Sequence, residues 1–94
     1  MANNKPIDTL RDGALKATIW ERTSEKGPFF SVELSRSYRT EDGTWKDSSS
    51  FVGDELLRIA RLASLAYDET LVHREQARER ERAASPEPNA GRLA

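Results

Sequence analysis

The chain of 94 residues contains no cysteine and only one histidine, His73. The lack of cysteine excludes a disulfide framework, a thiolate metal site and a thiol nucleophile. No apolar run approaches the roughly 20 residues of a membrane-spanning helix, and residues 1–6 lack the apolar core of a signal peptide. We therefore expect a cytoplasmic protein of bacterial type that has no contact with a membrane.

Motifs of catalysis are equally scarce. His73 stands in a run of charged residues, and we interpret it as a solvated surface side chain. No carboxylates have the spacing of a metal site or of an acid–base pair, and the serines at 48–50 lack the context of a nucleophile elbow. The sequence therefore predicts a protein that is not an enzyme, with no metal, no cofactor and no small-molecule substrate.

An excess of positive charge is also missing, since 15 Lys and Arg residues stand against 16 Asp and Glu residues. A generic binder of polyanions usually carries a basic excess, so any role with nucleic acid depends on cations gathered on one face. The length fits one small domain. We divide the chain into a disordered N-terminus (1–6), a single sheet-plus-helix domain (7–76), and a charged helical extension with a disordered tail (77–94).

What the sequence does contain is a run of strand patterns between residues 7 and 51. Along residues 14–22, apolar Leu15, Ala17 and Ile19 alternate with polar or aromatic neighbours, as in a strand with one buried face. Residues 7–11, 29–39 and 45–51 are the other predicted strands. Asp-Gly pairs at 12–13 and 42–43 provide the positive φ angles of tight hairpin turns, and residues 23–28 are expected to form a loop.

After residue 53 the period of the apolar residues changes from 2 to 3.6, which predicts a helix with Asp54 as its N-cap or as an acid of its first turn. The fold class is therefore α+β, an antiparallel meander of three to four strands followed by one long C-terminal helix. The stripe expected to cover the sheet consists of Leu56, Ile59, Ala60, Ala63, Ala66, Tyr67 and Leu71.

Three further apolar residues of the helix, Leu62, Leu65 and Val72, fall outside that stripe and are predicted to be exposed. An open sheet with one helix also leaves free strand edges. Both features favour a homodimer, with these three residues at a dimer or partner interface. One hypothesis for the function is accordingly a protein-interaction module that works through these residues together with Arg58 and Arg61.

The other hypothesis comes from aromatic residues interleaved with cations on the strands. In proteins that bind single-stranded DNA or RNA, cations contact phosphates and flat rings stack on unpaired bases, at about 1–3 kcal/mol per base. The alternative is that the tryptophans are core residues with one polar edge and that the cations only keep the sheet soluble. The predicted nucleic-acid contacts are Lys16, Trp20, Arg22, Arg36, Tyr38, Arg39, Trp45 and Lys46.

The stretch 32–46, followed by a polar strand and by Asp54-Glu55-Leu56-Leu57, resembles the positive-cofactor-four family of transcriptional coactivators and its bacterial relatives. The resemblance covers about residues 15–71. It implies a dimer that is built from a curved antiparallel sheet and one helix in each subunit, and that binds single-stranded DNA. It places Tyr38 where the family has a base-stacking aromatic residue, and Arg36 and Lys46 near its phosphate-contacting cations.

The sequence departs from this family in one respect that bears on affinity. The family has a strongly basic turn before its third strand, whereas residues 46–50 here contain one cation and one acid. We therefore expect weaker phosphate binding than the family shows. The chain is also similar to small bacterial proteins of unassigned activity, and that similarity implies no function.

Overall fold

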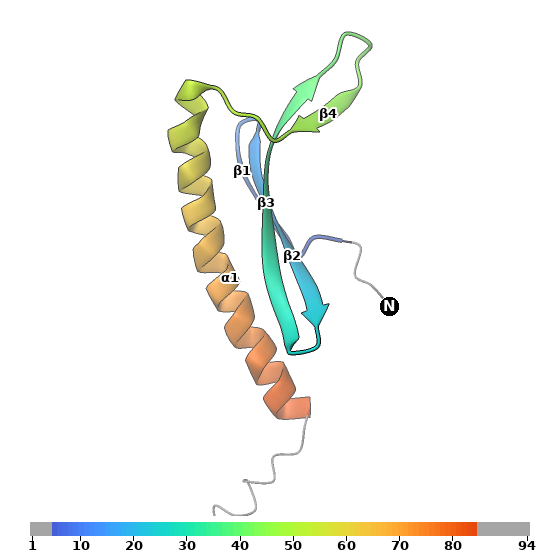
Figure 1. Ribbon diagram of the computed structural model, residues 1–94, viewed down its shortest axis with the longest axis vertical. Helices are drawn as coiled ribbons and strands as arrows, with labels where there is room; N and C mark the ends of the chain where they lie inside the picture. The colour runs from blue at the N-terminus through green and yellow to red at the C-terminus, as the bar shows by residue number, and fades with distance from the viewer. Residues whose placement is uncertain (1–4, 85–94) are drawn as a thin grey trace, which may run out of the picture.

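The computed structural model describes residues 5–84, which form a four-stranded antiparallel sheet followed by one helix (Figure 1). Neighbours in the sheet are also neighbours in the sequence, in the order β1-β2-β3-β4. This confirms the predicted α+β class, a meander followed by a C-terminal helix. The elements are β1 (Asp8–Asp12), β2 (Leu15–Ser24), β3 (Gly27–Arg39), β4 (Trp45–Ser48), the 3₁₀ turn η1 (Gly53–Glu55) and α1 (Leu56–Ala84).

Two of the predicted turns form at glycines with positive φ. Gly13, with φ of 62°, lies in the turn between β1 and β2, and Gly43, with φ of 88°, lies in the turn between β3 and β4. A Cβ atom at Gly13 would lie 2.8 Å from the guanidinium of Arg58. Glycine at this position thus satisfies both the turn and the close approach of the helix.

The prediction of a loop at residues 23–28 was wrong, because β2 and β3 are longer than expected. Thr23 pairs with Pro28, and Ser24 pairs with Gly27, so only two residues connect the strands. The Ser24 hydroxyl donates to the Gly27 carbonyl oxygen at 2.9 Å and accepts from the Lys26 N–H at 3.2 Å, which closes the short turn.

The fourth strand is shorter than the predicted segment 45–51, since β4 ends at Ser48. The Ser48 hydroxyl accepts a hydrogen bond from the backbone N–H of Ser50 at 3.0 Å, which turns the chain out of the sheet. Phe51 then packs against the core cluster. Burial of this ring stabilises a strand that ends at Ser48, relative to one that continues through residues 49–51 and leaves the ring exposed.

The core lies between one face of the sheet and α1. Leu15, Ala17 and Ile19 of β2 are buried against Ile59, Leu62 and Ala66 of α1. Partly buried side chains from the other segments surround this cluster, namely Ile7, Leu10, Val32, Leu34 and Phe51. The alternation seen along residues 14–22 therefore identifies the buried face of the sheet correctly.

The prediction of the buried face of the helix was wrong in part. Ile59 and Ala66 are buried as expected, but Leu62 is only 4% exposed, whereas Leu56, Tyr67 and Leu71 are exposed. Apolar residues occupy most of the circumference of the first turns of α1, so a 3.6-residue period fits more than one stripe. Because Leu62 belongs to the core, it is not available for contact with a partner.

The helix contacts the sheet beyond residue 76. Ala77 is buried, and the Arg80 guanidinium lies 3.2 Å from the carboxylate of Glu21 on β2. The charged stretch therefore contacts the end of the sheet at Ala77 and Arg80, while residues 78–84 are themselves exposed. Residues 1–4 and 85–94, predicted as disordered ends, lie outside the described residues. No helix within residues 5–84 combines the length and the hydropathy needed to cross a bilayer.

Candidate functional site

The sheet has one face covered by α1 and one face that the helix leaves open (Figure 1). Paired residues of neighbouring strands share a face, and side chains alternate along each strand, so the register assigns every side chain to one of the two. Lys16 pairs with Ser35 and Trp20 with Ser31, both out of phase with the buried Leu15 and Ile19. The predicted contacts on the open face are Lys16, Trp20, Arg22, Arg39 and Trp45.

The remaining predicted contacts, Arg36, Tyr38 and Lys46, belong to the other face. Arg36 pairs with Leu15, and Tyr38 pairs with Lys46, in phase with the core residues. They lie on the hairpin of β3 and β4, which extends past the start of α1 (Figure 1). The structure therefore divides the eight predicted residues between two faces.

On the open face, the cations and the ring of Trp20 are held by neighbouring side chains. The Lys16 ammonium lies 3.1 Å from a carboxylate oxygen of Asp47, and the Trp20 indole N–H donates to Glu33 at 3.1 Å. The Arg22 guanidinium lies 5.1 Å from the centre of the Trp20 ring. These contacts hold the ring and both cations in place, and the helix does not cover them.

Lys16, Trp20, Glu33 and Asp47 line a hollow of ≈ 630 Å³ on the open face, to which all four strands or their flanking residues contribute. Its charged lining residues are Arg11 and Lys16 against Glu33 and Asp47, so the charges balance. The hydrogen bond from Lys16, followed by that from Ser37, lowers the pKa of Asp47 below its ordinary value. Asp47 is thus an anion that competes with phosphate for Lys16.

Two of the three residues on the hairpin face, Arg36 and Tyr38, are also held by neighbouring groups. Arg36 lies 3.4 Å from Glu55 and donates to the carbonyl oxygen of Ser50 at 3.3 Å. Its guanidinium lies 5.8 Å from the centre of the Tyr38 ring. On the opposite side of the same hairpin, Arg39 lies 5.9 Å from the Trp45 ring, which is 65% exposed. The hairpin therefore presents one aromatic–arginine pair on each face.

Of the predicted interface residues on α1, Leu65 and Val72 are exposed and Leu62 is not. Arg58 is bound within the chain, because its guanidinium donates to the carboxylate of Asp12 at 3.1 Å and to the Asp12 carbonyl oxygen at 3.0 Å. The hydrogen bonding of Arg58 to the carboxylate holds the pKa of Asp12 below its ordinary value. Arg58 thus ties α1 to β1 instead of facing outward.

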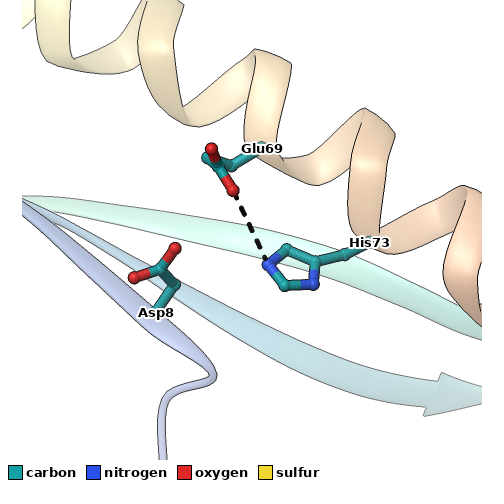
Figure 2. Close-up of side chains that lie close together, drawn as sticks. All are labelled: Asp8, Glu69 and His73. Atoms are coloured by element: carbon teal, nitrogen blue, oxygen red, sulfur yellow. Dashed lines mark ion pairs between the residues drawn. The ribbon is translucent and has the colours of Figure 1, made fainter.

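His73 is not the solvated side chain that the sequence predicts. Its side chain is 23% exposed, and its ring lies 5.8 Å from that of Phe30 on β3. Glu69, one helical turn earlier, and Asp8 on β1 lie beside it (Figure 2). The spacing of Glu69 and His73 is visible in the sequence, but the approach of Asp8 depends on the docking of the helix.

Compared with protein-family models, curated proteins and solved structures, the chain matches none. The resemblance to the positive-cofactor-four family thus stays a prediction from the sequence.

Proposed function

We propose that this protein binds single-stranded DNA or RNA, without sequence preference, on the open face of its sheet. The observation that carries the proposal is the hollow lined by Trp20 and Lys16, which α1 leaves open. An indole stacks on any base, and an ammonium at the same surface meets the backbone phosphate. Exposed Trp45 and Arg39 at the hairpin extend the same chemistry along this face.

The balanced charge of the hollow limits the affinity for nucleic acid that we expect. Lys16 binds phosphate only by exchanging its contact with Asp47, so we expect modest affinity that falls steeply as salt is raised. A role in transcription, as the family resemblance implies, would then rest on transient contact with melted DNA rather than on tight storage of single strands.

Replacing Asp47 by asparagine should strengthen binding of single-stranded DNA by about 3- to 10-fold, because one anion leaves the hollow and Lys16 is released. The measurement is fluorescence anisotropy of a labelled oligothymidylate of about 16 nucleotides in low salt. Asp68→Asn, an equal change of charge on an exposed residue of α1, is the control and should leave the affinity unchanged. The proposal fails if wild-type protein produces no change in anisotropy at tens of micromolar.

A second candidate function, self-association, is favoured by an unpaired strand edge beside exposed apolar side chains. β3 pairs with β4 only at residues 36–39, so within the described part of the chain residues 27–35 have no strand partner on that edge. Tyr67 and Leu71 of α1 are exposed, and Arg74, on the same side of the helix, lines a hollow with Pro28 and Phe30 of β3. A second copy would pair β3 with β3 about a two-fold axis and cover these side chains.

This dimer predicts different effects for two leucines on opposite flanks of α1. Leu71→Asp should convert a dimer to a monomer, because a charge would be buried beside the β3 edge. Leu65→Asp should leave the dimer intact, since Leu65 lies with Arg11 and Asp12 on the flank toward β1. Sedimentation equilibrium measures both. The opposite order of effects would place the contact on the Leu65–Val72 flank, and a wild-type monomer would rule out the dimer.

A further inference from the structure

Three potential metal ligands converge between β1 and α1. Asp8 pairs with Ile19, so its side chain lies on the helix side of the sheet. Glu69 and His73 are four residues apart on α1 and project from the same side of the helix. One ligand atom of each residue lies within 4.8 Å of the others. Figure 2 shows the three side chains close together between the helix and the first strand. Asp8 is distant in sequence from Glu69 and His73, and the docking of the helix on the sheet brings the three residues together. The cluster is therefore a product of the fold and not a run of acidic residues on one surface segment.

One ring nitrogen of the histidine in this cluster lacks a hydrogen-bond partner within the described residues. Its Nε2 atom is buried and has no hydrogen-bond partner among the described residues. The nearest carboxylate oxygen, Oε1 of Glu69, is 4.0 Å away, which is beyond hydrogen-bond distance. Buried polar atoms are nearly always satisfied, so an orphaned imidazole nitrogen facing two carboxylates indicates a missing ligand.

We propose that Asp8, Glu69 and His73 bind a divalent transition-metal ion of the zinc class. Two carboxylates and a neutral imidazole carry a charge of −2, which a divalent cation neutralises. A nitrogen ligand favours Zn²⁺, Co²⁺ or Ni²⁺ over Mg²⁺ and Ca²⁺, which prefer oxygen. Three protein ligands leave one tetrahedral position for water.

The geometry requires only a small closure of the cluster. In a tetrahedral site with metal–ligand distances of about 2.0–2.2 Å, neighbouring ligand atoms lie about 3.4 Å apart. The carboxylate of Glu69 is 42% exposed and can move toward His73 without disturbing the core. Two side chains four residues apart on a helix, as Glu69 and His73 are, can bind the same metal ion.

The ion would join the first strand to the helix. β1 is one of the two edge strands of the sheet, and its five residues pair only with β2 within the described chain. A ligand from β1 and two from α1 would couple the docking of the helix to the pairing of this edge. Metal binding would therefore stabilise the folded chain, since the unfolded chain holds the three ligands apart.

The test uses the full chain without a histidine tag, after treatment with a chelator, titrated with Zn²⁺ by calorimetry. We expect one equivalent of Zn²⁺ to bind at micromolar concentrations and to raise Tm by about 5 °C. Mg²⁺ should neither bind at these concentrations nor raise Tm. Co²⁺ in the same site should give the visible absorption of a tetrahedral ion. His73→Gln, Glu69→Gln and Asp8→Asn should each weaken Zn²⁺ binding at least about tenfold.

Glu75→Gln is the matched control, because it removes an exposed carboxylate from the same helix that pairs with Arg78 outside the cluster. It should bind Zn²⁺ as the wild type does. Three results would each overturn the proposal: no saturable Zn²⁺ binding, unchanged affinity in His73→Gln, or unchanged affinity in Asp8→Asn. Circular dichroism of the Glu69→Gln variant, whose substituted side chain is half-exposed, would distinguish a loss of binding from a loss of fold.

Discussion

Replacing Leu62 by alanine should lower the free energy of unfolding by about 2–5 kcal/mol, because a buried leucine leaves a cavity in the core. Leu62 is 4% exposed and packs with Ile59 and Ala66 against β2. In a small domain, whose total stability is often about 5 kcal/mol, this loss would unfold a large share of the molecules. Urea denaturation followed by circular dichroism gives the change in midpoint.

The control for this prediction is three residues farther along the same helix. Leu65 is 44% exposed, so Leu65→Ala removes little buried surface and should cost below about 1 kcal/mol in a monomer. A ratio of the two losses near one would mean that α1 is rotated about its axis from the position described. That outcome would restore Leu62 as a candidate for contact with a partner.

The second large effect concerns the proposed nucleic-acid face. Trp20→Ala should weaken binding of single-stranded DNA by about 5- to 150-fold, the equivalent of losing one stacked base. Trp20 is half-buried on the open face and stands outside the core cluster, so the fold should survive the change. Anisotropy with a labelled oligothymidylate measures the affinity, and the fluorescence of the remaining Trp45 reports whether the hairpin also contacts DNA.

Tyr67→Ala provides the control, because Tyr67 is an exposed aromatic residue on α1, away from the open face. Its loss should leave DNA binding unchanged. Equal affinity in Trp20→Ala and the wild type would remove the stacking platform from the proposal, even if the cations still attract DNA. In that case self-association through β3 would be the better-supported function.

The parts of the fold that follow from local patterns were predictable. Alternation of Leu15, Ala17 and Ile19 identified the buried face of the sheet, and glycine after aspartate located the turns at Gly13 and Gly43. The face of the helix was not predictable, since several apolar stripes compete on α1 and only the fit against β2 selects one. Alanines such as Ala63 do not mark a stripe, because they are tolerated on any face of a helix.

The candidate sites were harder to predict for two physical reasons. Tyr38 and Arg39 are adjacent in the sequence but, as neighbours in a strand, they point to opposite faces, so a cluster in sequence becomes two pairs in space. His73 stands in a charged run, which is typical of a solvated side chain. Its burial depends on contact with β1 and β3, and no local pattern encodes that contact.

The order of the elements also bears on how the chain folds during its synthesis. Hairpins pair residues that are close in sequence, whereas contacts of the helix with the sheet span longer separations, 46 residues for Arg58 with Asp12. At about 5–20 residues per second, the ribosome completes the sheet, which ends at Ser48, roughly 0.5–4 seconds before it has added Ile59, Leu62 and Ala66, which close the core. During this interval Leu15 and Ile19 are exposed to solvent, and the nascent meander presents an apolar surface to chaperones and to other nascent chains.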